Sequence, residues 1–364
     1  MSDEKSPNDL LSEYIDVYLE HKDKMYMGDE LEIKFGTKRF NQINKVDFDN
    51  IISKLKSLEF YPEKQEGEYT LNITNEYADA RTGKMRDSNI RTTLTGIRKI
   101  QTYCKENRLS EEKLNNVTFL QKFRKTVTDR GDRLRPIDFH DFHFRVNYKT
   151  ERNVTPKRGV MKPEVAQLID NWRDTKKVFR FIKRYTFVHR DKTDFPFKID
   201  LSIVKSNKQR RLAGGRKVFV KEYSVEEANV FNEPENYEVE IELMNSIAKN
   251  QVKGELMYKL KKAIKMILSG WQKTNFPTAY TEHDEILKEY MILLHGKENV
   301  PKNQYGKVRR ANTRDFLGPS SISLEVKNIM PLDVDSSVAN INHPYTVTDK
   351  ADGERKLLFI THTG

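Results

Sequence analysis

The sequence predicts an α+β protein built around an antiparallel β-barrel with flanking helices. Several segments alternate polar and apolar residues with a period of two, and amphipathic helical patterns surround them. The polar faces are also sorted by sign, being carboxylate-rich in the first and last of these segments and mainly basic in those between. An open antiparallel sheet would turn such faces to water. A closed barrel would point them inward, where they are useful around a charged ligand.

Six segments carry the alternation. The first, 29–37, sets Glu30, Glu32 and Lys34 against apolar neighbours. The last, 237–243, repeats the pattern with a row of glutamates, Glu238, Glu240 and Glu242. The segments between them cover residues 89–94, 142–151, 177–187 and 197–204. We therefore expect six strands whose charged faces lie together.

Helical spacing of apolar residues predicts two helices, over 8–24 and 47–60, on either side of the first strand. Two more are predicted over 255–267 and 284–294, after the last strand. A polar stretch then indicates a linker, with a domain boundary near residue 300. We expect a barrel domain over 1–245, a helical segment and linker over 246–311, and the beginning of a second domain over 312–364.

The composition favours a polyanionic partner. The chain has 364 residues, with 65 Lys and Arg against 54 Asp and Glu, which gives a net charge of +11. No apolar run is long enough to cross a bilayer, and the polar N-terminus lacks the features of a secretory signal. A single cysteine, Cys104, excludes an internal disulfide. We expect an intracellular protein without a membrane partner.

The paired glutamates predict a metal site. Carboxylates gathered on inward faces would repel one another unless a divalent cation were bound, and hard oxygen ligands without a Cys or His cluster favour Mg²⁺ or Mn²⁺ over zinc. Glutamates on one exposed strand would merely add solubility, but two such strands joined by basic ones favour the metal. The expected ligands are Glu30, Glu32, Glu240 and Glu242. Glu238 is expected to position water or to join the ligands.

A metal site of glutamates beside strands rich in Arg and Lys suits a phosphate chain, because hydrolysis of a γ-phosphate requires both a metal and cations around the transferred group. Taken singly, each basic residue could equally face solvent or contact RNA at the surface. Lys183 would replace Arg184 if a bulge shifted the parity of its strand. The expected phosphate-binding residues are Lys34, Arg91, Arg145, Arg180, Arg184 and Lys198.

On these residues, the chain resembles the triphosphate tunnel metalloenzymes, in particular the RNA triphosphatases of capping enzymes from large DNA viruses and fungi. The segments 30–34 and 238–242 match the two metal motifs of that family, and the resemblance covers roughly residues 25–245. It implies an eight-stranded antiparallel tunnel that holds the triphosphate and the metal. It also implies 5′-triphosphate RNA as the substrate, with catalysis by the inward glutamates, which are Glu30, Glu32, Glu238, Glu240 and Glu242.

A second motif, at 350–355, has the form KxDG. It resembles the nucleotidyl-lysine motif of capping guanylyltransferases and polynucleotide ligases, and the preceding FLGPSSISLE resembles the lead-in of the viral enzymes. The resemblance implies that Lys350 attacks the α-phosphate of GTP, while Asp352, Gly353 and Arg355 bind the nucleotide. Taken alone, the string is short enough to arise by chance.

The sequence ends at Gly364, directly after this motif. We therefore expect an N-terminal fragment that carries the triphosphatase and only the start of a nucleotidyltransferase domain, so lysine guanylylation is not expected from it. A parent enzyme would perform both steps and could be joined by a cap methyltransferase domain or subunit. If the parent is viral, its place is the host cytoplasm, in a viral factory, or the virion.

Two other functions stay open at this stage. One is a tunnel phosphohydrolase that acts on free nucleoside triphosphates or on polyphosphate. The other is a non-catalytic RNA-binding module that kept the shape of the tunnel. Both intact glutamate motifs weigh against the second.

Overall fold

The structure is a computed structural model, and it describes residues 6–20, 28–36, 42–79, 81–109, 117–124, 134–156, 161–213, 215, 217–303, 306–317, 323–331, 340–344, 346–347 and 357–362. The chain divides into two compact units, Met1–Pro277 and Thr278–Gly364. The predicted segment 246–311 is therefore shared between both units. No helix in the described ranges has the length and apolar character needed to cross a membrane.

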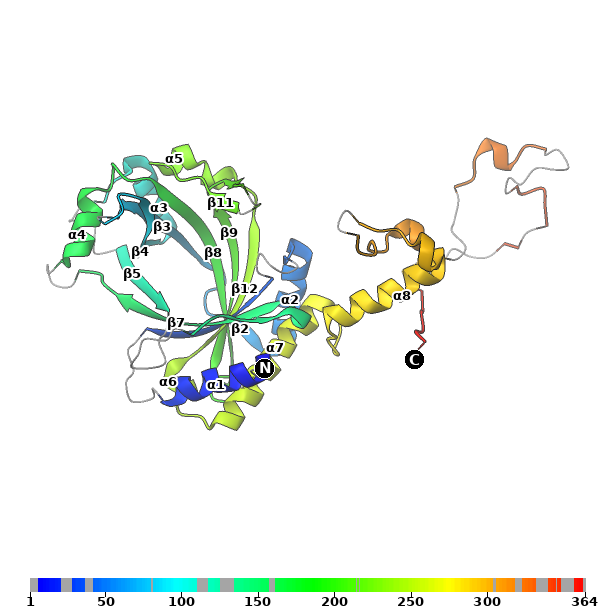
Figure 1. Ribbon diagram of the computed structural model, residues 1–364, viewed down its shortest axis with the longest axis horizontal. Coiled ribbons are helices and arrows are strands. Elements are labelled where there is room, and N and C mark those ends of the chain that lie inside the picture. Colours follow the sequence, from blue (N-terminus) through cyan, green and yellow to red (C-terminus); the bar gives the residue numbers. More distant parts are fainter. Residues whose placement is uncertain are drawn as a thin grey trace. The chain divides into compact units, whose positions relative to one another are not determined.

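The first unit is a closed antiparallel β-barrel (Figure 1). Eight strands are hydrogen-bonded in the circular order β1-β12-β9-β8-β3-β4-β5-β7, and the pairing of β7 with β1 closes the ring. The predicted barrel is thus confirmed. Its strands are β1 (Asp29–Phe35), β3 (Glu68–Ala78), β4 (Met85–Thr95), β5 (Val117–Arg124), β7 (Phe144–Asn153), β8 (Lys177–His189), β9 (Phe197–Ser206) and β12 (Asn236–Leu243).

Shorter strands extend the barrel. β2 (Phe60–Pro62) pairs with β8, and β6 (Ile137–Phe139) pairs with β7. A separate two-stranded ribbon is formed by β10 (Gln209–Arg211) and β11 (Lys217–Phe219).

Helices surround the barrel. In the first unit they are α1 (Pro7–Glu20), α2 (Lys45–Ser57), α3 (Ile97–Glu106), α4 (Pro163–Asp170), α5 (Val225–Ala228), α6 (Asn245–Ala248) and α7 (Lys253–Gln272), with the 3₁₀ turns η2 (His140–Phe142) and η3 (Val230–Asn232).

The second unit contains α8 (Tyr280–Asn299), η4 (Thr313–Asp315) and η5 (Val326–Asn328).

The boundary of α2 differs from the prediction. The helix was expected to reach Phe60, but it ends at Ser57, and Glu59 adopts a positive φ of 60° that turns the chain. Phe60 instead begins β2. A pattern of apolar residues continues through this turn, so spacing alone could not show where the helix stops.

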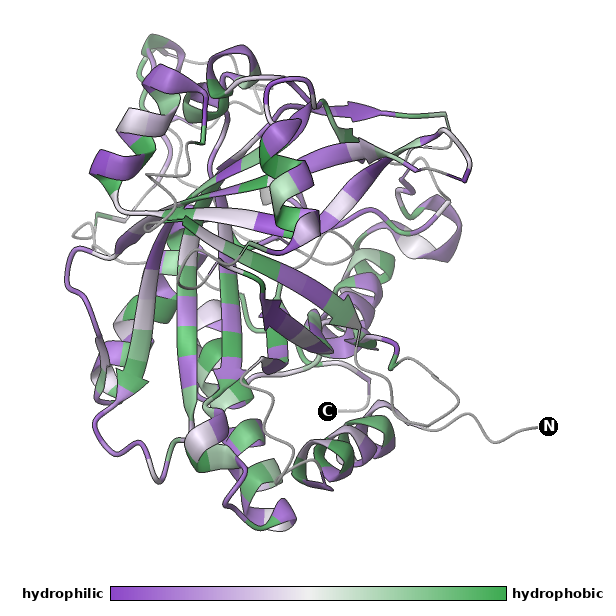
Figure 2. Cartoon of the chain, turned by 90° about the vertical axis from the view of Figure 1, so that its left-hand side faces the viewer, coloured by the Kyte–Doolittle hydropathy of each residue, from purple (hydrophilic) through white to green (hydrophobic). Residues whose placement is uncertain are grey.

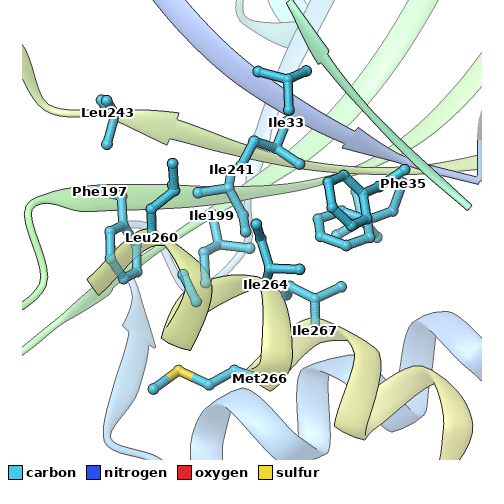
Figure 3. Packing of buried hydrophobic residues seen from close by; sticks show 14 of the residues in the cluster. Ile33, Phe35, Phe197, Ile199, Ile241, Leu243, Leu260, Ile264, Met266 and Ile267 are labelled. Atoms are coloured by element: carbon cyan, nitrogen blue, oxygen red, sulfur yellow. The ribbon is translucent and has the colours of Figure 1, made fainter. Parts of the chain in front are cut away.

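The apolar faces of the strands point outward, toward the helices. One cluster joins β1, β9 and β12 to α1, α2 and α7; Figure 3 shows Ile33, Ile199 and Ile241 packed against Ile264 and Ile267 of α7. A second cluster joins β3, β4, β5 and β8 to α3, α4 and α5. The core therefore lies outside the barrel, and the polar residues are left for its interior. The alternation is visible along the strands in Figure 2.

Two glycines permit close packing in this arrangement. A Cβ at Gly28 would lie 1.6 Å from the carbonyl oxygen of Glu151, so only glycine lets β1 start beside the end of β7. A Cβ at Gly270 would lie 2.8 Å from Cα of Ile51, so α7 crosses α2 in direct contact.

A buried acid fixes the start of β1. Asp29 accepts hydrogen bonds from Tyr148 Oη (3.2 Å) and Thr150 Oγ1 (3.1 Å), and its carboxylate lies 3.7 Å from Nζ of Lys249. Asn245 donates to its carbonyl oxygen at 2.7 Å. Because the side chains of a strand alternate, a fixed, outward Asp29 makes the next residue, Glu30, point into the barrel.

Candidate active site

The polar faces of all eight strands meet inside the barrel. The register of each ladder places residues of like parity opposite one another, so that Glu32 faces Glu242 across β1 and β12 and Asp200 faces Glu240 across β12 and β9. Charged residues of this interior, called the lining below, are Glu30, Glu32, Lys34, Arg91, Lys122, Arg145, Lys149, Glu151, Arg180, Arg184, Lys198, Asp200, Glu238, Glu240 and Glu242.

Lys34 joins the two predicted metal motifs. Its Nζ lies 2.6 Å from Oε1 of Glu240 and 3.1 Å from Oε2 of Glu32. Burial acts to raise the pKa of Glu240, but Lys34, Arg184 and Arg180 outweigh it and hold the pKa at about 2. Glu240 is therefore an anion throughout the physiological pH range.

Glu30 lies in a different environment. Burial raises its pKa to about 7, and the carboxylates of Glu151 and Glu242 add to the rise against the attraction of Lys122. Lys122 Nζ lies 3.4 Å from Oε2 of Glu30 and also contacts Glu151. Arg91 Nη2 lies 3.3 Å from Oε1 of Glu151, while its buried Nε has no hydrogen-bond partner among the residues that the structure describes. This part of the lining has an incompletely compensated carboxylate and an unused donor.

Basic residues of β8 and β9 line the adjoining wall. Arg180 donates to both carboxylate oxygens of Glu238, at 2.7 and 2.9 Å. Arg184 Nη1 lies 3.2 Å from Oδ2 of Asp200. Lys198 Nζ lies 3.1 Å from Oε2 of Glu242, yet burial still raises the pKa of that glutamate.

The parity of β8 is settled by its pairing. The registers of β8 with β3 and with β9 run without a bulge, so Arg184 lies on the inward face. Lys183 lies on the opposite face, with its ammonium 5.3 Å from the ring centres of Tyr69 and Tyr185.

Arg145 is held differently from the other predicted phosphate ligands. It is in register with Lys34 across β7 and β1, but its guanidinium forms a two-point ion pair with Asp138 of β6, at 2.6 and 2.8 Å. Asp138 is opposite Arg145 in the short β6–β7 ladder, a pairing that sequence periodicity did not predict.

A cavity of about 580 Å³ opens at one mouth of the barrel. Lys34, Arg180, Glu238 and Glu240 line its inner part. The end of β9, the ribbon and the loop before α2 line its outer part, with residues such as Ser206, Gln209, Phe219, Gln42 and Asn44. The cavity gives the lining access to solvent.

Four charged members of the lining were not predicted as site residues. Lys122 lies on β5, a strand that the sequence analysis did not identify. Lys149 contacts Glu32, Glu151 contacts Lys122, and Asp200 accepts a hydrogen bond of 2.6 Å from Thr186. The alternation of polar and apolar residues had already placed Lys149, Glu151 and Asp200 on polar faces. This pattern could have identified them as site residues.

The residues of the KxDG motif, Lys350, Asp352, Gly353 and Arg355, lie outside the described part of the chain. Their predicted roles stay predictions.

The lining has the donors that a hard divalent cation prefers, although none of the described Asp, Glu, His and Cys side chains stand in groups of three close enough to chelate one. Lysine ammonium groups occupy the positions between the glutamates, as Lys34 does between Glu32 and Glu240. Burial raises the pKa values of Glu30 and Glu242 despite their lysine partners, so a further cation beside them would favour their ionised form. The donor chemistry of Glu30, Glu32, Glu240 and Glu242 thus fits Mg²⁺ or Mn²⁺.

Comparison with curated proteins gives a match to a protein named "Probable mRNA-capping enzyme" from Acanthamoeba polyphaga mimivirus, 32% identical over 131 residues. The chain is similar to a viral mRNA-capping enzyme. The aligned part is 36% of this chain and 9% of that protein, so the chain spans a small part of its relative. Comparison with models of known protein families gives no match.

Solved structures give a related result. The RNA triphosphatase domain of the mimivirus mRNA-capping enzyme aligns over 72% of this chain and 99% of its own, with 15% identity and a TM-score of 0.42. A monoclinic form of the mimivirus capping-enzyme triphosphatase aligns with a TM-score of 0.41 and 15% identity, over 72% of this chain and 98% of its own.

Proposed function

We propose that this chain is the RNA 5′-triphosphatase part of an mRNA-capping enzyme, which hydrolyses the γ-phosphate of 5′-triphosphate RNA and leaves 5′-diphosphate RNA. The observation that carries the proposal is the sorted lining of the barrel, in which glutamates of β1 and β12 face arginines and lysines of β4, β5, β8 and β9. The similarity to the mimivirus capping enzyme supports RNA as the substrate.

In this proposal the cations bind the phosphate chain. Arg91 offers its Nε, which has no partner in the described part of the chain. Arg184 and Lys198 are charged at any pH of interest, because neighbouring carboxylates outweigh burial and raise their pKa values. As negative charge develops on the transferred phosphoryl group, these fixed cations stabilise it without reorganisation. Lys34 and Arg180 hold the phosphates nearer the mouth.

The attacking oxygen comes from water. Water attacks the γ-phosphorus, the bond from that phosphorus to the β–γ bridging oxygen breaks, and orthophosphate and the 5′-diphosphate leave. Glu238, clamped by Arg180 at the mouth, is the residue that we propose orients the water. Glu30, Glu32, Glu240 and Glu242 would hold Mg²⁺ or Mn²⁺, which when bound neutralises phosphate charge and activates the nucleophile.

The second capping step belongs to the parent enzyme in this proposal. The KxDG motif would supply Lys350 for a lysine–GMP intermediate made from GTP, with Asp352, Gly353 and Arg355 binding the nucleotide. A capping enzyme of a large DNA virus would act in the host cytoplasm or in the virion.

The test is release of labelled γ-phosphate from 5′-triphosphate RNA in the presence of Mg²⁺ or Mn²⁺, with free ATP as competitor. Metal-dependent release that Glu32→Ala abolishes and that ATP barely inhibits supports the proposal. Equal or faster turnover of ATP would instead indicate a general phosphohydrolase of free nucleotides. Release from neither substrate, in a folded protein, would contradict both and favour a binding module.

A further inference from the structure

The ribbon formed by β10 and β11 presents a concentration of basic residues beside the mouth of the barrel. Lys208, Arg210, Arg211 and Lys217 are all exposed. Within the described part of the chain, no carboxylate lies within ion-pair distance of any of them. Exposed lysines elsewhere do have such partners: Lys45 pairs with Asp49 on α2, for example. The charge of the ribbon is thus available to a ligand.

The ribbon is continuous with the cavity at the mouth. Gln209 and Phe219, which are opposite one another in the β10–β11 ladder, both line it. Arg211 and Lys217 form the next pair of like parity, so they share the face of Gln209 and Phe219 and lie about 7 Å further from the barrel. Arg210 lies on the opposite face, paired with Val218.

Buried hydrogen bonds fix the ribbon to the barrel. Asn207, which is 3% exposed, accepts a hydrogen bond from the amide of Phe179 on β8 at 2.7 Å and donates to the carbonyl of Val220 at 2.8 Å. The amide of Val220 in turn donates to the carbonyl of Lys208 at 2.8 Å. The ribbon therefore starts from a rigid base, at the end of β9 in Figure 1.

We infer that the face of Gln209, Arg211, Lys217 and Phe219 is the track along which the RNA chain leaves the barrel. Single-stranded nucleic acids are bound by a row of cations that follows the phosphates and by aromatic rings that stack on bases. The cations here are Arg211 and Lys217, and Phe219 is an aromatic ring on the same face at the mouth. The track would make the site prefer RNA to free nucleotides. The inference rests on the proposed function.

The test compares two double variants that remove the same charge from opposite faces of the ribbon. Arg211→Ala/Lys217→Ala should raise KM for 5′-triphosphate RNA roughly fivefold or more and lower the slope of log affinity against log salt by about 1.4. KM for ATP should stay unchanged, because ATP ends inside the mouth. Lys208→Ala/Arg210→Ala should leave KM for RNA near that of the unmodified protein.

An unchanged KM for RNA in the first variant, or an equal rise in both variants, would overturn the inference while the proposed function stands. Anisotropy with a labelled 5′-hydroxyl RNA gives an answer that does not depend on hydrolysis. If the unmodified protein releases no phosphate, the proposed function fails. A loss of affinity for this RNA confined to Arg211→Ala/Lys217→Ala would still support the track, and equal affinities would overturn it.

Discussion

Nζ of Lys34 on β1 donates a hydrogen bond of 2.6 Å to Oε1 of Glu240 on β12, and the two residues are direct partners in the ladder. The same ammonium reaches Glu32 at 3.1 Å. The lysine thus neutralises two of the four carboxylates that we propose as metal ligands. Lys34 should therefore stabilise the metal-free protein more than it stabilises the metal-bound protein.

Lys34→Met should destabilise the metal-free protein by about 2–3 kcal/mol, because it leaves the largely buried carboxylate of Glu240, 17% exposed, without its nearest cation. Mn²⁺ should restore more of the melting temperature in this variant than it adds to the unmodified protein, since the ion would supply the missing charge. Thermal unfolding with and without Mn²⁺ measures both effects. Lys183→Met, on the outward face of β8, is the control. Equal gains from Mn²⁺ in all three proteins would contradict the placement of the metal.

The parity of β8 gives a second prediction. Arg184→Ala should lower the rate of phosphate release on the order of a hundredfold, because it removes a fixed cation from the lining. Its neighbour Lys183 lies outside the barrel against Tyr69 and Tyr185, so Lys183→Ala should release phosphate normally. Steady-state kinetics of the two variants decide the matter. A larger loss in Lys183→Ala than in Arg184→Ala would refute the assigned face.

The packing of α7 gives a third prediction. Ile267 is fully buried against the outward faces of the strands (Figure 3), and Ile267→Ala should lower the free energy of unfolding by about 2–5 kcal/mol. Tyr258 lies on the same helix but is 67% exposed, so Tyr258→Ala should cost little. Denaturant titration of both variants provides the comparison. If Ile267→Ala unfolds like the unmodified protein, α7 does not share the core of the barrel.

Lys177, fully buried at the start of β8, gives a prediction for alkaline pH. Burial lowers its pKa from 10.5 to about 8, so between these values the unfolded chain binds a proton that the folded chain does not. The contribution of this residue to stability should therefore grow as the pH rises from about 8 to about 10.5. Between about pH 8 and 10.5, the melting temperature of the unmodified protein should rise relative to that of Lys177→Met. Lys176→Met is the control and should follow the unmodified protein. A constant difference between the unmodified protein and Lys177→Met would show that Lys177 does not titrate there.

The sequence predicted most of the barrel because six strands carry charged residues on one face. It did not predict β3 or β5. The inward face of β3 holds uncharged residues such as Thr70 and Asn72, and a bulge between Thr74 and Glu76 breaks the alternation. On β5 the apolar Leu120 lies on the inward face, which blurs the period of two. The eight-stranded ring was implied only by the family resemblance.

The sequence predicted which residues line the site better than it predicted which of them contact one another. Alternation shows which face a residue occupies, and it placed Glu32, Glu240 and Arg184 in the interior. It could not show that Asp138 would hold Arg145, or that Lys122 would lie against Glu30, because these contacts depend on which strands become neighbours. That order is set by long-range packing of the outer faces on the helices, which short sequence patterns do not encode.

The most direct test of the account is the metal dependence of γ-phosphate release from 5′-triphosphate RNA, measured for Glu240→Gln beside Glu235→Gln. Glu240 lies within the barrel, and Glu235 lies at its mouth, outside the proposed metal ligands. We expect Mg²⁺ or Mn²⁺ to activate the unmodified protein and Glu235→Gln alike. Glu240→Gln should release no phosphate at any metal concentration, although it still folds and unfolds cooperatively at a somewhat lower temperature because Lys34 loses its nearest carboxylate. Full, metal-dependent release by a folded Glu240→Gln would contradict the account.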